Sequence, residues 1–195
     1  MALTHSSDFK VAVIGASGYG GIQLVRLLKD HPNFELTFLG GERTVGKSWN
    51  ELFPFLPLSE DLVIKASDPE IISNFADFVV LSLPNGLASQ ITPSLLNKGL
   101  RVLDLSADYR FRSLDLWKQI YITESSNYDR DDYDLCSEAV YGLPEWNQSK
   151  IATSRLVSCP GCFPTASLLA LIPFLKQGLI ENEGLIIDAK SGTSG

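Results

Sequence analysis

The first forty residues constrain the fold most strongly, because they alternate between strand, glycine turn, helix and strand patterns. Residues 10–14 are a short apolar run typical of a buried strand, and residues 35–39 predict a second one. Between them lie Gly15-Ala16-Ser17-Gly18-Tyr19-Gly20-Gly21 and an apolar helical pattern that ends near Asp30. Glycines at this spacing permit a tight turn, close approach to a pyrophosphate and close helix–strand packing. The unit predicts a doubly wound α/β fold of the Rossmann type that binds a dinucleotide. The alternative is a doubly wound fold that merely uses a tight turn.

The loop after the second strand bears on which dinucleotide is bound. An acid near the strand end favours NAD through the ribose 2′-hydroxyl, whereas an arginine favours NADP through the 2′-phosphate. Glu42 and Arg43 are both present, but Gly40 and Gly41 leave no acid at the strand tip itself. We therefore expect Arg43 to favour NADP(H); a solvated loop arginine is the alternative.

Two further strand patterns, residues 78–83 and 101–105, bring polar residues to the same edge of the predicted sheet. Ligands of open α/β sheets bind outside the carboxyl ends of the strands, so both tips should face the crevice. Arg110 follows the second tip and suits a bidentate grip on a carboxylate or phosphate. A structural ion pair with Asp104 or Asp108 explains it equally well.

A second polar region precedes the last third of the chain. The charged run at residues 129–132 is most simply a solvated loop. The turn-like stretch Tyr141-Gly142-Leu143-Pro144-Glu145 contains one acidic residue among apolar neighbours. Glu145 is therefore a candidate to tune a site, or else it caps a neighbouring element.

The stretch Ser158-Cys159-Pro160-Gly161-Cys162-Phe163-Pro164-Thr165 carries the reactive chemistry. Leucines and isoleucines at spacings of three and four follow in residues 166–176, which predicts a helix with one face turned to a core. Pro164 fits its first turn. Cys162 then lies at the positive end of the helix dipole, where a thiolate is stabilised. This makes Cys162 a candidate nucleophile, with a buried structural thiol as the alternative.

Cys159 and Cys162 also form a C-x-x-C, which suggests a thiol redox motif. In that function Cys159 would attack, and the nucleotide-fold pattern before it would have no purpose. A reversible, inactivating disulfide is a further option. Together with Cys136 the pair is an incomplete zinc set, so no metal site is expected.

Composition excludes several classes of function. The net charge of −7 argues against a nucleic acid or an anionic membrane as the main partner. No apolar run approaches the roughly 18 residues of a spanning helix, and the first ten residues lack the pattern of a signal or transit peptide. Three cysteines then suggest reduced thiols in the cytoplasm. The predicted strand at residues 184–189, followed by a Ser/Gly loop, looks like the interior of a domain, so the chain is expected to be part of a longer protein.

In this order, the motifs resemble the N-acetyl-gamma-glutamyl-phosphate reductase family. The first of them is shared with other dehydrogenases, whereas the cysteine segment and the YGLPE stretch are more specific. The resemblance spans the whole chain but only a little over half of the usual family length. The stretches that carry it are residues 15–21, 103–110, 141–145, 160–165 and 191–195.

The resemblance implies an NADPH-dependent enzyme of arginine biosynthesis that reduces an acyl phosphate to a semialdehyde. Cys162 would hold a thioester after inorganic phosphate leaves. Arg110, with Glu145 nearby, would bind the anionic substrate, and Ser191 and Gly192 would lie near the nicotinamide.

The resemblance also implies a domain division and a homo-oligomer. Residues 1–158 would form the NADP-binding domain, and residues 159–195 would begin an α+β catalytic and dimerisation domain that is incomplete here. The family's acid–base histidine would fall after residue 195, because His5 and His31 lie at the wrong end of the architecture. Cys159 and Phe163 depart from the residues common in the family.

Three readings stay open beside this one: a related reductase acting on N-acetyl-aminoadipyl or aspartyl phosphate, a nucleotide-binding piece without catalysis, and the thiol redox module.

Overall fold

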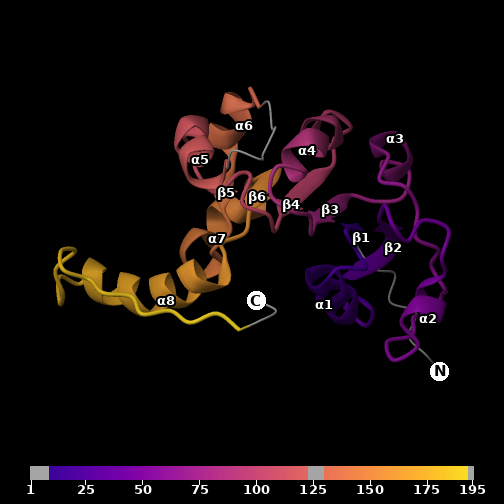
Figure 1. Cartoon of the computed structure of the whole chain (residues 1–195), viewed down its shortest axis with the longest axis horizontal. Helices are drawn as coiled ribbons and strands as arrows, with labels where there is room; N and C mark the ends of the chain where they lie inside the picture. The colour runs from indigo at the N-terminus through magenta and orange to yellow at the C-terminus, as the bar shows by residue number, and fades with distance from the viewer. Residues whose placement is uncertain (1–8, 123–129, 193–195) are drawn as a thin grey trace.

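A computed structural model describes residues 9–122 and 130–192 as a parallel six-stranded sheet with helices on both faces (Figure 1). The strand order is β2-β1-β3-β4-β6-β5, and every pair of neighbouring strands is parallel. The chain moves outward from β1 first to β2 and then, on the other side, to β3, so the topological switch point lies between β1 and β3. The strands are β1 (Phe9–Ile14), β2 (Phe34–Gly40), β3 (Phe78–Leu81), β4 (Arg101–Asp104), β5 (Val140–Tyr141) and β6 (Leu156–Ser158). The helices are α1 (Tyr19–Leu28), α2 (Trp49–Leu52), α3 (Pro69–Ile72), α4 (Ala88–Asn97), α5 (Leu114–Tyr121), α6 (Tyr133–Glu138), α7 (Pro144–Thr153) and α8 (Cys162–Lys176).

The core has two halves, one on each face of the sheet. Alternate residues of β1 point to opposite faces, so Ala12 and Ile14 join one cluster and Val13 joins the other. Trp117 is buried in the first cluster and Trp49 in the second. A sheet that is apolar on both faces is what the continuous hydrophobic strand runs of the sequence require. The doubly wound fold and the four strands predicted before residue 106 are confirmed.

The strand predicted at residues 184–189 is wrong. These residues form no strand, and their large side chains are exposed, Ile186 by 93%. A strand needs a neighbour to accept and donate its backbone hydrogen bonds, and nothing in residues 9–122 or 130–192 pairs with this segment. The apolar pattern indicates that the segment favours a strand conformation, but a strand also needs a neighbouring strand, and the pattern does not provide one.

The solvated loop expected at residues 129–132 is also wrong for its described part, Arg130 onward; Asp129 lies outside the described residues. Arg130 is only 5% exposed. Its Nε and Nη2 each donate to the Asp132 carboxylate at 2.9 Å, and its Nη1 donates to the Asp108 carbonyl at 2.9 Å. The guanidinium also lies over the Trp117 ring, 4.3 Å from its centroid. A charge can be buried when paired and stacked in this way.

Helix α8 extends away from the sheet (Figure 1). The helix itself is confirmed, but its predicted core-facing side is not, because none of its residues is buried. Phe174, for example, is 51% exposed. At 15 residues it is the longest helix among those described, and none of them is long and apolar enough to cross a membrane.

Candidate active site

The glycine turn after β1 is packed so closely that side chains would not fit. Gly15 has φ +78°, and its N–H and that of Ala16 donate to the Gly40 carbonyl at 2.9 and 3.1 Å. A Cβ on Gly15 would collide with the Ser82 carbonyl oxygen beyond β3, and one on Gly21 would collide with the Gly15 carbonyl oxygen. The turn therefore joins the ends of β1, β2 and β3 at the switch point.

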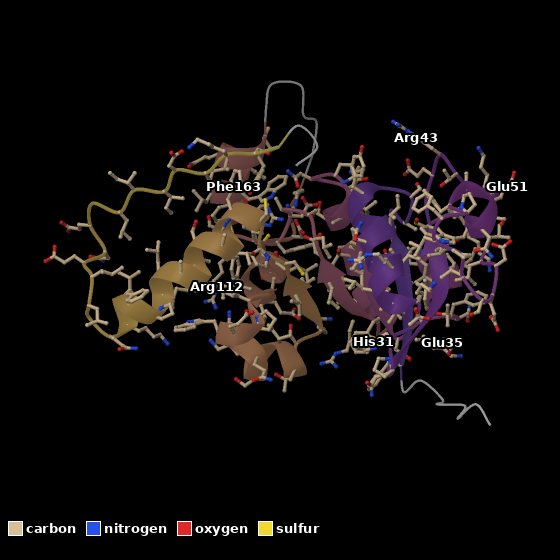
Figure 2. The ribbon with its side chains drawn as sticks, turned by 90° about the horizontal axis from the view of Figure 1, so that it is seen from below. His31, Glu35, Arg43, Glu51, Arg112 and Phe163 are labelled. Carbon is tan, nitrogen blue, oxygen red and sulfur yellow. The ribbon has the colours of Figure 1, made fainter. Side chains whose placement is uncertain are left out.

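A groove of about 650 Å³ opens beside this turn. Gly15, Ser17 and Arg43 line it, with Arg43 exposed at its rim, at the end of the molecule away from α8 (Figure 2). Gly18 caps α1 without any side chain, so N–H groups in the first helical turn are free to meet an anion. The other predicted cofactor-binding residues of this stretch belong to the same turn and the start of α1: Ala16, Gly18, Tyr19, Gly20 and Gly21.

The tips of β3 and β4 are locked together by a buried carboxylate. Asp108 accepts hydrogen bonds from the N–H groups of Gly86 at 2.6 Å and Ser89 at 2.8 Å, which caps the start of α4. The Asn85 Oδ1 accepts from the Ala107 N–H at 3.0 Å. Local sequence patterns could not predict this cap, because Asp108 is 22 and 19 residues away from the two N–H groups that it accepts.

Arg110 holds the cysteine loop. Its Nε donates to the Cys159 carbonyl at 2.9 Å and its Nη2 to the Leu105 carbonyl at 3.0 Å. It forms no ion pair with any described residue, so the pairing with Asp104 or Asp108 is wrong. A Cβ at Gly161 would lie 3.3 Å from Arg110 Nη1, so the guanidinium packs against the loop just before α8.

Cys162 is the first residue of α8 and is exposed. Gly161 caps the helix without a side chain, and its carbonyl accepts both the N–H and the hydroxyl of Thr165, at 3.0 and 2.9 Å. Cys162 therefore stands at the positive end of a 15-residue helix, as the sequence predicts.

Cys159 has the opposite environment. It is half-buried, and desolvation raises the pKa of its thiol to about 11, with the Asp104 carboxylate adding to the rise and Arg110 opposing it. Its N–H donates to the Asp104 carbonyl at 2.7 Å, which ties the loop to β4. A thiol of this kind is mostly protonated at neutral pH and is a poor nucleophile.

A buried polar layer lies beneath the cysteine loop. Asp104 is fully buried; its Oδ1 accepts from the Ser106 N–H at 2.8 Å, and its Oδ2 has no hydrogen-bond partner among the described residues. Burial raises the pKa of Asp104 to about 6, against the lowering effect of its hydrogen bonds to Ser106. Ser158, aligned with Asp104 across β4 and β6, also has an unpartnered buried hydroxyl. The one sequence feature that indicates this buried layer is Asp104, an acidic residue within the apolar strand pattern of residues 101–105.

Three predicted residues are not brought into contact with this site. Glu145 is exposed in the first turn of α7, where a negative charge suits the helix dipole, and no described residue bonds to its carboxylate. Ser191 and Gly192 lie on the exposed segment after α8, and the Ser191 hydroxyl donates only to the Gly192 carbonyl. Their roles stay predictions.

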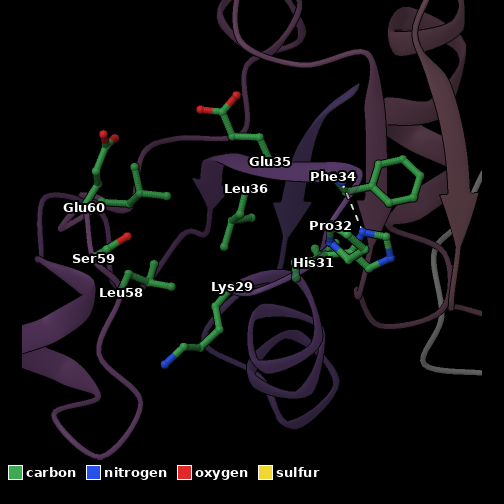
Figure 3. Close-up of a pocket in the computed structure, with 11 residues that line it drawn as sticks. Lys29, His31, Pro32, Phe34, Glu35, Leu36, Leu58, Ser59 and Glu60 are labelled. Atoms are coloured by element: carbon green, nitrogen blue, oxygen red, sulfur yellow. Dashed lines mark hydrogen bonds between the residues drawn. The ribbon is translucent and has the colours of Figure 1, made fainter. Parts of the chain in front are cut away.

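His31 lies at the opposite edge of the sheet. Its Nδ1 accepts from the N–H groups of Asn33 and Phe34 at 3.2 and 3.1 Å, just before β2 begins, beside a shallow pocket of about 280 Å³ (Figure 3). It is a turn cap and not an acid–base group for Cys162; His5 lies outside the described residues. No three His, Cys, Asp or Glu side chains gather as a metal site in residues 9–122 and 130–192.

Comparison with known protein families agrees with this arrangement. Residues 10–154 match the family model of the semialdehyde dehydrogenase NAD-binding domain. The chain belongs to the semialdehyde dehydrogenase family. Residues 162–195 match the dimerisation domain of the same family, so the match resumes at Cys162.

Curated relatives carry the family name that the motifs suggested. The chain is 63% identical over 195 residues to an N-acetyl-gamma-glutamyl-phosphate reductase of Prochlorococcus marinus (strain MIT 9211), covering all of this chain and 54% of that protein. It is 61% identical over 186 residues to one of Parasynechococcus marenigrum (strain WH8102), covering 95% and 52%. The chain thus spans about half the length of the relatives it matches.

Solved structures confirm the fold. An aspartate semialdehyde dehydrogenase II of Vibrio cholerae aligns with a TM-score of 0.62 at 18% identity, over 87% of this chain and 47% of that one. An aspartate semialdehyde dehydrogenase with NADP from Candida albicans aligns with a TM-score of 0.58 at 22% identity, over 88% and 48%. At these identities the likeness concerns the fold alone.

Proposed function

We propose that the protein containing this chain uses NADPH to reduce N-acetyl-gamma-glutamyl phosphate to its semialdehyde, in arginine biosynthesis. The observation that carries the proposal is the exposed Cys162 at the start of α8, in a loop held by Arg110 at the carboxyl ends of the strands. The names of relatives at 60–63% identity support the choice of substrate.

The Cys162 thiolate attacks the acyl carbon, so a C–S bond forms, the bond from carbon to the phosphate oxygen breaks, and inorganic phosphate leaves. Cys162 is the first residue of α8, and a thiolate is a strong nucleophile for an acyl carbon. When bound, NADPH would supply the hydride that reduces the thioester carbonyl. The C–S bond then breaks, the semialdehyde is released and Cys162 regains its thiolate.

The groove beside the glycine turn has the features of a dinucleotide site. Bare glycines bring the backbone to its surface, and the uncapped start of α1 suits a pyrophosphate. Arg43 at the rim would face the 2′-phosphate of NADP(H). Ser191 and Gly192 are kept as predicted nicotinamide contacts.

Arg110 would act on the anionic substrate while holding the loop. Its Nε and Nη2 are bonded to backbone carbonyls, which leaves Nη1, beside Gly161, without a described acceptor. A charge-assisted bond from this atom would suit a phosphate or carboxylate near Cys162. Glu145 stays a predicted substrate-binding residue.

The C-x-x-C alternative requires Cys159 to be the more reactive thiol. Its burial and raised pKa argue against that, because attack in thiol exchange depends on the thiolate. The proposed division makes residues 1–158 the nucleotide-binding domain and residues 159–195 the start of a dimerisation domain. The family matches at residues 10–154 and 162–195 support this proposal, and a homo-oligomer would form through the second domain.

Two assays test the proposal. The 195-residue chain should quench or shift NADPH fluorescence on binding. The chain completed with the C-terminal half of a Prochlorococcus marinus relative should reduce NADP⁺ with N-acetylglutamate semialdehyde only when phosphate is present. Activity with aspartate semialdehyde in preference would favour the related reductase, and binding without turnover in the completed chain would favour a non-catalytic function.

A further inference from the structure

A small cavity of about 150 Å³ lies at the β5 edge of the sheet, apart from the dinucleotide groove. Buried Tyr109 and Ala139 form part of its lining, and exposed Arg112 and Lys150 stand at its rim. Figure 2 shows Arg112 far from Arg43, which marks the groove. Pockets that enclose drug-sized ligands measure roughly 300–1,000 Å³, so this cavity suits a single small group.

The lining of the cavity is positively charged. Arg110, Arg112 and Lys150 contribute to it, and no carboxylate does among residues 9–122 and 130–192. The side chains of Arg112 and Lys150 make no hydrogen bond or ion pair with any described residue. Two nearby arginines are paired instead: Arg155 binds Glu138, and Arg130 binds Asp132. In a chain of net charge −7, three cations with no described carboxylate in the same lining make a local site of attraction for anions.

Neutral groups in the lining can add hydrogen bonds. Burial raises the pKa of the half-buried Tyr141 hydroxyl, with Arg110 opposing the rise, so this group stays a proton donor at neutral pH. Asn147 Nδ2 donates to the Tyr141 carbonyl at 2.9 Å, which fixes α7 against β5. This side of the cavity wall is therefore held by a side-chain bond to the backbone that does not depend on a ligand.

The strand order places this cavity on the other side of the cysteine loop from the dinucleotide groove. The groove lies over the ends of β1, β2 and β3, and the cysteine loop follows β6. The cavity is lined by the segment after β4, by β5 and the residue before it, and by α7. Arg110 contacts the cysteine loop with Nε and also lines the cavity. An anion in the cavity would thus lie on the side of the loop away from the dinucleotide.

We propose that this cavity is a binding site for a small anionic group, a carboxylate or a phosphate, with Arg112 and Lys150 as its cations. Within the proposed function, on which this identification of the ligand rests, the group is the carboxylate that the substrate carries at the end away from the reacting carbonyl. The site would then make the enzyme prefer an acidic substrate chain.

Calorimetric titration of the 195-residue chain tests the site without requiring turnover. The probes are N-acetyl-L-glutamate and, separately, inorganic phosphate. Arg112→Gln and Lys150→Gln should each weaken binding about two- to fivefold, and the double variant about tenfold, as expected for partly exposed ion pairs. Lys10→Gln, which neutralises an exposed lysine near the start of β1, is the matched control and should leave binding unchanged.

The two probes separate the two sources of the anion. Weaker binding of N-acetyl-L-glutamate alone identifies the carboxylate, whereas weaker binding of phosphate alone supports an anion site that serves phosphate. Equal binding of both probes by the double variant and by Lys10→Gln, with both variants folded by thermal melting, overturns the inference. Because the readout is binding, a failed reductase assay with intact anion binding would sink the proposed function and leave the cavity assignment standing.

Discussion

Helix α8 with the segment after it, and the sheet with its helices, contain the same kinds of side chain in opposite environments. Trp117 and Trp49 are fully buried in the two cores. Phe174 and Ile186, beyond the sheet, are exposed by 51% and 93%. Burial, and not apolar composition, stabilises a fold. The difference shows that the buried side chains of residues 9–158 provide most of the stability of the described chain. Cys162 lies where this packed region ends: Arg110 holds the loop before it, and its own side chain is exposed.

Truncating a large apolar side chain in each region tests this contrast most strongly. Trp117→Ala should lower the free energy of unfolding by about 3–5 kcal/mol, because it leaves a cavity and removes the ring beneath Arg130. Phe174→Ala should change it by no more than about 0.5 kcal/mol. Urea unfolding followed by circular dichroism measures both. Similar losses from the two variants would mean that α8 is packed as firmly as the sheet.

The buried carboxyl beneath the cysteine loop should make the packed region sensitive to pH. The pKa of Asp104 is raised from 3.8 to about 6, so folding favours its protonated form. The group therefore imposes no penalty below about pH 4, and its penalty grows as pH rises to about pH 6, reaching on the order of 3 kcal/mol.

Asp104→Asn removes this titration. The free energy of unfolding of the wild type should fall relative to that of the variant between about pH 4 and pH 7. Urea titrations at both pH values provide the comparison, and Asp77→Asn, at an exposed position, serves as the control. Parallel behaviour of wild type and Asp104→Asn would show that Asp104 ionises normally.

Arg110 connects the packed region to the cysteine loop, so its loss should affect the chemistry more than the fold. Arg110→Ala removes the two bonds to backbone carbonyls and should lower reductase activity of the completed chain about 10- to 100-fold. Arg110→Lys should recover only part of it, since an ammonium cannot reproduce the fork. Rates with saturating and limiting substrate separate loop positioning, seen in kcat, from substrate binding, seen in KM. An unchanged rate in both regimes would remove Arg110 from the site.

The smallest effect is expected at the rim of the groove. Arg43→Ala should weaken NADPH binding by the 195-residue chain about tenfold while leaving NADH binding nearly unchanged, because only NADPH offers a 2′-phosphate. Fluorescence titration measures both affinities, and Lys47→Ala is the control for general loss of charge. Equal weakening of both cofactors would assign Arg43 to a contact other than the 2′-phosphate.

Local patterns allowed much of this fold to be predicted. The apolar runs at residues 10–14 and 101–105 and the glycine turn between strand and helix fix their own conformation, since the signal lies within a few residues. Cys162 at a helix start was predictable for the same reason. The family resemblance rested on equally local motifs.

Contacts between distant segments could not be predicted in this way. The sequence offered an ion pair of Arg110 with Asp104 or Asp108, whereas Arg110 donates to the Cys159 carbonyl, 49 residues away. The charged run around Arg130 predicted a solvated loop. The sequence does not show that the rings of Tyr109 and Trp117 lie against this arginine in the fold. The apolar periodicity of α8 predicted that one face of the helix packs against other residues. A periodic pattern does not identify those residues.

The central claim is that Cys162, and not Cys159, is the nucleophile, and matched serine variants of the completed chain test it directly. Phosphate-dependent reduction of NADP⁺ with N-acetylglutamate semialdehyde is the measurement. Cys162→Ser should lose more than about 10³-fold of the activity, as expected when a covalent nucleophile is removed. Cys159→Ser should keep most of the activity, because the raised pKa of the Cys159 thiol makes it a poor nucleophile. Arg110 binds the Cys159 backbone carbonyl, which the serine variant retains. Loss of activity in Cys159→Ser with activity retained in Cys162→Ser would contradict the account.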